Sequence, residues 1–167
     1  MATVSVFSDS CLAMQGYVGV LDAAKRQLAL AIRFTPAVCT GLIVAGLAMH
    51  SAAWLAGVAA IALIGGLFPS GHPIDLVYNH GVRHLVGGDK LPPNPPPRRF
   101  ACLVAMLVLG GAAAGFATGH PTVGYVLGGF MVAAGVTVTL TNWCLASWMY
   151  GLVLGKPSAV PVAVRSH

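Results

Sequence analysis

The sequence contains no glutamate, and its acidic residues are four aspartates among 167 residues. Charged residues make up 8% of the chain and apolar residues 57%, whereas a soluble domain usually carries about a quarter charged residues. A water-soluble fold of this length needs far more polar surface. The composition therefore excludes an ordinary soluble domain and indicates a chain whose solvent is the lipid bilayer.

Motifs of soluble enzymes and of nucleic-acid binding are also missing. There is no phosphate-binding glycine motif, no paired carboxylate, no nucleophile elbow, and no C-x-x-C pair among the four cysteines. The nine lysines and arginines are spread along the chain without a dense basic stripe. No aspartate lies within a long apolar run, which argues against transport driven by an intramembrane carboxylate. The sequence thus shows no evident catalytic centre and predicts no nucleic-acid partner.

Long apolar runs are what the chain does contain. A helix crosses the ~30 Å hydrocarbon layer with about 20 residues, and lipid permits only helices or closed barrels. Strict alternation, which a barrel requires, is absent. We therefore expect an all-α polytopic membrane protein with four transmembrane helices, over residues of about 28–50, 52–68, 100–118 and 122–142.

The fourth apolar run stays uncharged to Leu154, and its 33 residues make a helix of about 50 Å, which is too long for one span. We expect the span to end near Asn142, where aromatic residues typical of a membrane interface begin. Residues 143–154 should then lie along the membrane face. These aromatic residues are Trp143, Trp148 and Tyr150.

Short connections organise the four spans into two antiparallel hairpins. His50 and Ser51 join the first pair, and Gly119, His120 and Pro121 join the second. The longer connection between the hairpins begins with residues 73–86, which have the pattern of an amphipathic helix on the inner membrane surface. Proline-rich residues 91–97 follow as an extended spacer.

The positive charges predict the orientation. Neither tight turn contains lysine or arginine, and cytoplasmic loops carry an excess of these residues. The N-terminal segment 1–24, the long connection and the tail 156–167 should therefore be cytoplasmic, around a transmembrane domain of residues 25–155. This predicts a multi-pass protein of the inner membrane with both termini inside.

Glycines recur every four residues in the third and fourth spans. Small residues at this spacing let helix backbones approach closely. The pattern predicts tight packing of the two helices against each other, or self-association, through Gly111, Gly115, Gly119, Gly124 and Gly128.

Histidines offer two weak candidate metal or cofactor sites. His80 and His84 share a helix face, and His72 lies eight residues before His80. Imidazoles at this spacing can bind one metal ion, although the sequence identifies no further ligand, and the alternative is that they face headgroups or solvent. His50 and His120, in the two outer turns, can approach each other and suggest a haem or copper site.

Cys144 is the candidate thiol. It follows Thr139, Thr141 and Asn142, whose polar side chains need partners in lipid and are expected to face other helices. A thiol near an interface is reactive where cations lower its pKa, and the alternative is a buried structural cysteine. Nothing polar in the sequence beside Cys39 or Cys102 suggests activation of those thiols.

Three short segments together resemble a known family: residues 21–34, residues 96–101, and Asn142-Trp-Cys-Leu-Ala-Ser147 with Tyr150. They are similar to the bacterial four-span DUF4395 family, a domain of unknown function, over roughly residues 22–155. The resemblance implies a cysteine pair near the end of the last helix. Here Cys144 is present and Ser147 takes the second position, so the resolving thiol of such a pair is missing. The resemblance also suggests a thioredoxin-like partner.

Three functions follow as hypotheses. The first is an accessory or scaffold subunit of a membrane complex, packed with other membrane subunits or with itself. The second is a thiol or sulfur-relay component that uses Cys144 with a partner thiol. The third is a histidine-based metal or haem site, although the sequence identifies no cofactor.

Overall fold

The computed structural model describes residues 6–18, 22–87, 90–155 and 160–161. The described chain is almost entirely helical, so the expected all-α class is confirmed. A π-helical segment, Tyr78–Val82, joins α4 to α5, and a two-residue parallel pair joins β1 (Tyr17–Val18) to β2 (Val160–Pro161). The helices are α1 (Val6–Met14), α2 (Asp22–Ala48), α3 (Ala52–Leu67), α4 (Pro73–Val77), α5 (Arg83–Val86), α6 (Pro96–Ala117), α7 (Pro121–Thr141) and α8 (Leu145–Leu154).

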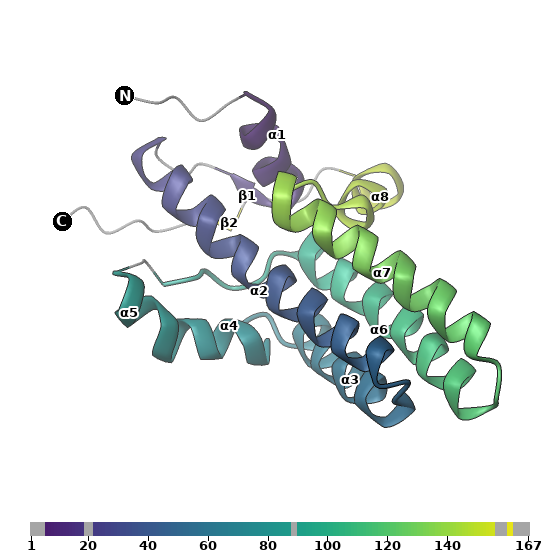
Figure 1. The fold of residues 1–167 in the computed structure, drawn as a ribbon. Helices are drawn as coiled ribbons and strands as arrows, with labels where there is room; N and C mark the ends of the chain where they lie inside the picture. Colours follow the sequence, from purple (N-terminus) through teal and green to yellow (C-terminus); the bar gives the residue numbers. More distant parts are fainter. Residues whose placement is uncertain (1–5, 19–21, 88–89, 156–159, 162–167) are drawn as a thin grey trace.

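Helices α2, α3, α6 and α7 lie side by side as a bundle (Figure 1). Within it α2 packs against α3 and α7, and α6 packs against the same two helices. Among the described residues, three helices are long and apolar enough to cross a membrane: residues 28–48 of α2, α6 and α7. Helix α3 has 16 residues, about 24 Å of helix, and falls short of that length.

Two tight turns close one end of the bundle (Figure 1). His50 has a φ of 50°, and the Ser51 side chain accepts a hydrogen bond from the Trp54 N–H at 3.2 Å, which caps α3. Gly119 has a φ of 75°, a conformation that glycine adopts at little cost. Helix α8 and the long connection lie toward the other end.

The start of α6 differs from the sequence-based expectation. The spacer was expected to extend through Pro97 with the helix beginning near Phe100, but α6 begins at Pro96. Proline fits the first turn of a helix, where its missing N–H would have no intrahelical partner. Arg98 and Arg99 are therefore helical residues rather than the end of a loop.

The segment between α3 and α6 is helical over residues 73–86, as expected, but includes the π-helical turn. Of the predicted tail 156–167, only residues 160–161 lie within the described chain, and residues 1–5 of the N-terminal segment lie outside it. Helix α7 ends at Thr141 because Asn142 takes a left-handed conformation with a φ of 58°. Cys144 then becomes the N-cap of α8.

Close packing of α6 on α7 occurs through glycine. A Cβ added to Gly115 would lie 2.9 Å from the Gly124 backbone nitrogen, so these helices approach with no room for a side chain. Gly111 faces Leu127 of α7, whereas Gly128 faces Leu47 of α2. Gly119 forms the turn, and nothing described lies within 4 Å of its Cβ position.

The bundle core consists of apolar side chains from α2, α3 and α6, on which Phe116, Leu127 and Met131 also pack. A second buried cluster, at the end that carries the long connection, joins α1, α2 and Tyr78. Between these apolar regions lies the cavity described next. The buried members of the bundle core are Ile43, Leu55, Val58, Ala59, Leu109, Ala112 and Ala113.

Candidate functional site

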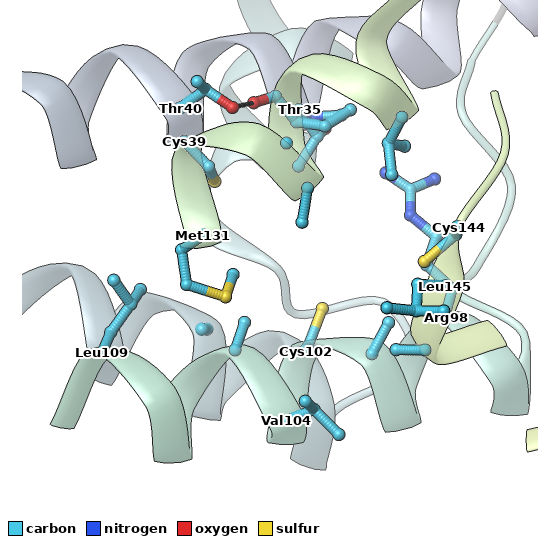
Figure 2. Close-up of a pocket in the computed structure, with 18 of the residues that line it drawn as sticks. Thr35, Cys39, Thr40, Arg98, Cys102, Val104, Leu109, Met131, Cys144 and Leu145 are labelled. Atoms are coloured by element: carbon cyan, nitrogen blue, oxygen red, sulfur yellow. Dashed lines mark hydrogen bonds between the residues drawn. The ribbon is translucent and has the colours of Figure 1, made fainter. Parts of the chain in front are cut away.

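A cavity of about 230 Å³ lies between the helices of the bundle (Figure 2). Helices α2, α3, α6, α7 and α8 all contribute to its wall, and apolar side chains make up most of it. The cavity extends from the end that holds Arg98 and His72 to about the middle of the bundle. Its larger apolar lining residues are Ile32, Ile43, Val58, Leu109, Phe130, Met131 and Met149.

Three cysteines from separate parts of the chain line this cavity: Cys39 of α2, Cys102 of α6 and Cys144 between α7 and α8. Figure 2 shows the three side chains around the same open space. Cys102 therefore shares one cavity with both Cys39 and Cys144. All four cysteines of the chain are free thiols, and Cys11 is not among the lining residues.

This arrangement changes the interpretation of Cys144. The sequence suggested a thiol without a resolving partner, because Ser147 stands where the family pattern has a second cysteine. Folding instead brings Cys102 and Cys39 to the same cavity. No local motif could reveal this, because the three cysteines lie on different elements far apart in sequence.

A buried ion pair lies at one end of the cavity. Arg98, which is 9% exposed, places Nη2 3.5 Å from Asp75 Oδ1 and donates from Nη1 to the Tyr17 hydroxyl at 2.8 Å. Asp75 also accepts hydrogen bonds from Asn94 Nδ2 at 3.0 Å and from the Thr35 hydroxyl. The carboxylate and the guanidinium therefore both have several partners away from water.

The sequence analysis did not single out this pair. Arg98 and Asp75 were both assigned to a membrane-surface connection, whereas both are buried. Two features of the sequence could have indicated the pair. Arg98 comes just before a long apolar run, and Asp75 is a lone acid among apolar residues of a predicted helix. Arg99 instead donates to the carbonyls of Gly66 and Leu67 at 3.0 and 2.9 Å, which satisfies the end of α3.

His72 also lines the cavity and is 3% exposed. Its Nδ1 is buried without a hydrogen-bond partner among the described residues. The ring lies against Gly65, where an added Cβ would be 2.1 Å from His72 Cδ2. Burial lowers the pKa of His72, and Arg98 lowers it further, while Asp75 acts in the opposite direction. The ring is therefore neutral at neutral pH.

His80 and His84 do not join His72 in a metal site within the described chain. His80 and His84 are exposed; His80 Nδ1 lies 2.9 Å from the Leu76 carbonyl oxygen, and Arg83 Nε donates to His84 Nε2 at 3.3 Å. Within the described ranges, no group of three or more histidine, cysteine, aspartate or glutamate side chains is positioned to hold a metal ion.

The two turn histidines each have other neighbours. The His50 ring packs edge-on against Tyr125 with 5.5 Å between ring centroids. His120 Nδ1 lies 3.2 Å from Thr118 Oγ1. The haem or copper site suggested for His50 and His120 therefore stays a prediction.

Asn142 fixes the chain just before Cys144. It is fully buried, its backbone carbonyl accepts a hydrogen bond from Gln15 Nε2, and its side-chain oxygen accepts from Arg33 Nε and Nη2 at 3.1 and 3.2 Å in the amide orientation that satisfies both groups. The expectation that Asn142 faces other elements is met. The hydroxyls of Thr139 and Thr141 instead have hydrogen-bond partners nearby in the chain.

Both threonines bond within α7. Their hydroxyls donate to the carbonyl oxygens of Gly135 and Thr137, each at 2.7 Å. A threonine can satisfy its hydroxyl on the preceding turn of its own helix, whereas the asparagine amide at the helix end needs partners elsewhere.

Comparison with known proteins identifies the family. Residues 29–154 match the domain of unknown function DUF4395, and this range contains every cavity-lining residue except Gln15. No curated protein and no solved structure matches the chain. Because the match covers most of the 167 residues, the chain belongs to the DUF4395 family.

Proposed function

We propose that this chain is a multi-pass protein of the inner membrane in which α2, α3, α6 and α7 cross the bilayer as two antiparallel hairpins. The bundle packing of these helices supports the proposal. The described turns at residues 49–51 and 118–120 carry no lysine or arginine. The short helix α3 is accommodated by local thinning of the bilayer.

The end of the bundle opposite these turns faces the cytoplasm in this proposal, since the described arginines and lysines lie toward it (Figure 1). The helical segment 73–86 lies on the inner membrane surface. Its support is a set of exposed apolar side chains that lipid would cover, namely Leu76, Val77, Leu85 and Val86.

Within this membrane protein we propose a thiol centre that exchanges disulfides with a partner protein. The observation that carries the proposal is that Cys39, Cys102 and Cys144 line one cavity. Cys144 is the thiol that meets the partner, because it lies in the non-helical break between α7 and α8. Cys102 is the resolving thiol in this proposal, because it lines the same cavity as Cys144.

The exchange balances as two substitutions at sulfur. A thiolate of a reduced partner attacks the Cys144 sulfur of a Cys102–Cys144 disulfide, which forms a mixed disulfide and releases the Cys102 thiolate. The second partner thiolate then attacks its own sulfur in the mixed disulfide and releases Cys144. The partner loses two electrons and two protons, and this chain gains them as two thiols.

The test uses the full-length protein in lipid nanodiscs with a purified thioredoxin-like protein whose second active-site cysteine is replaced by serine. After mild oxidation and rapid alkylation, we expect a mixed disulfide at Cys144 in the wild type. It should accumulate further in Cys102→Ser, be absent in Cys144→Ser, and be unchanged in the control Cys11→Ser.

Peptide mass spectrometry identifies the linked residues. If Cys144 carries no partner adduct in either the wild type or Cys102→Ser, thiol exchange is refuted. The chain is then better described by the accessory or scaffold hypothesis, in which the cavity serves helix packing.

A further inference from the structure

The cavity is larger and more apolar than thiol exchange with a protein requires. Exchange needs sulfur atoms in line, not an apolar space beside them. An engineered apolar cavity of about 150 Å³ binds benzene, so a cavity of about 230 Å³ has room for a single substituted ring. It is too small for a fused three-ring cofactor such as a flavin.

The cavity also opens on the outer surface of the bundle. Phe130 of α7 and Leu145 and Met149 of α8 line the cavity, yet each is also an exposed large apolar side chain. A residue with both properties lies at an opening. In a bilayer that opening faces lipid, so a molecule dissolved in the hydrocarbon layer can enter between α7 and α8.

Polar groups are concentrated at the end of the cavity that holds His72 and Arg98. The His72 ring lines the cavity, although its Nδ1 is enclosed by protein atoms and does not reach the open space. Arg98 adds positive charge nearby, which favours an oxygen that becomes negative.

We propose that this cavity binds a lipid-soluble quinone, and that the quinone reoxidises Cys102 and Cys144. The inference rests on the proposed thiol exchange and names its electron acceptor. The two thiols lose two protons and two electrons and form one S–S bond. The quinone gains both, its two carbonyl oxygens become hydroxyls, and the hydroquinone leaves into the lipid.

The features combine to favour this ligand class. A quinone ring is apolar and flat, matches the size of the cavity, and has carbonyl oxygens whose developing negative charge the nearby Arg98 favours. It accepts two electrons, the number that two thiols release. An acyl chain of a lipid also fits an apolar cavity, but it cannot oxidise a thiol.

The experiment uses the reduced full-length protein in nanodiscs, with a benzoquinone that bears one isoprene unit as the probe. Quinone reduction is followed by absorbance and free thiols by alkylation and mass spectrometry. We expect one hydroquinone for each pair of thiols lost and a Cys102–Cys144 disulfide as product. Cys102→Ser should slow the reaction by roughly a hundredfold, as loss of a positioned reactant does, while Cys11→Ser should not change it.

Two matched α7 variants separate binding from chemistry. Ala134→Phe fills the cavity, because Ala134 lines it, whereas Ala133 is exposed and absent from the lining, so Ala133→Phe is the control. The quinone should raise the melting temperature of wild type, Cys102→Ser and Ala133→Phe, but not of Ala134→Phe. Prenol, which has the tail without the ring, should have no effect.

Two results would overturn the quinone proposal. One is an equal melting shift with prenol, which identifies the cavity as a site for lipid chains. The other is quinone reduction that is equally fast in Ala134→Phe and Ala133→Phe, which places the reaction outside the cavity. Partner exchange through Cys144 is measured separately without quinone, so its failure and the failure of the quinone site are distinguishable.

Discussion

Arg98 of α6 and Asp75 of α4 form a buried ion pair across 23 residues of sequence, with 3.5 Å between Nη2 and Oδ1. The pair ties the bundle to the helical connection that precedes α6. Removing one partner of a buried pair leaves an uncompensated charge, which typically costs about 3–5 kcal/mol.

Arg98→Met should therefore destabilise the protein by roughly 3–5 kcal/mol. The double variant Arg98→Met/Asp75→Leu should recover a large part of this loss, since neither charge remains. Unfolding in detergent micelles measures the stability of the single and the double variant. Lys90→Met, at an exposed position, serves as the control. Equal stability of the single variant and the control would show that solvent reaches the pair.

Gly115→Leu should disrupt the packing of α6 on α7, because a Cβ at this position already lies 2.9 Å from the Gly124 nitrogen. Overpacking of this kind costs roughly 1–3 kcal/mol. Gly110→Leu, on the same helix with nothing described within 4 Å of its Cβ position, is the matched control. Thermal melting compares the two variants, and indistinguishable curves would contradict the glycine contact.

His72 should make stability depend on pH. Burial lowers its pKa, so below the usual histidine value of about 6.5 the unfolded chain binds a proton that the folded protein resists. Stability should be fully retained above that pH and lost progressively as the pH falls below it. Asp75 and Arg98 interact with the ring electrostatically, so neither residue is changed in the variant used for the test.

The measurement is the melting temperature between pH 8 and pH 5 for wild type and His72→Gln. The variant should show a smaller decline over the acidic part of this range. Parallel curves would mean that other groups control the pH dependence.

Substitution of Asn142 should lower the stability of the protein through both the lost side-chain hydrogen bond and the left-handed backbone. Asn142→Gly keeps the left-handed conformation but loses the bond to Arg33, whereas Asn142→Ala loses the bond and also strains the backbone at a φ of 58°. A left-handed residue with a Cβ costs about 1–2 kcal/mol. The melting temperature should fall in the order wild type, Asn142→Gly, Asn142→Ala. A higher melting temperature for Asn142→Ala than for Asn142→Gly would contradict the cost assigned to the left-handed backbone.

Topology can be tested with single added cysteines in native membranes. Ser70→Cys and Thr122→Cys are both at exposed positions, toward opposite ends of the bundle (Figure 1). An impermeant thiol reagent applied outside should label Thr122→Cys and leave Ser70→Cys unlabelled until the membrane is permeabilised, with the wild type as background. Labelling of both positions from one side would refute the proposed hairpins.

Hydropathy and turn residues predicted the helical class because both signals are local. The break after α7 was also predictable, since the apolar run exceeds one span and contains Asn142. The start of α6 was missed because prolines suggest an extended spacer, although the first helical turn tolerates them.

The cavity was not predictable from sequence. Cys39 and Cys102 have unremarkable local surroundings, and what distinguishes them is their common position opposite Cys144. The same holds for Arg98, whose buried position depends on Tyr17 and Asp75. Sequence patterns describe residues within one helix, whereas these relations arise between helices.

The position of the cavity along the bundle has a consequence for the bilayer. The cavity reaches from Arg98 to about the level of Leu109, and the far turns at His50 and Gly119 contribute nothing to its wall. In a bilayer crossed by these helices, the opening beside Phe130 and Met149 therefore belongs to one leaflet. A hydrophobic molecule in the opposite leaflet must then move across the midplane before it reaches this opening.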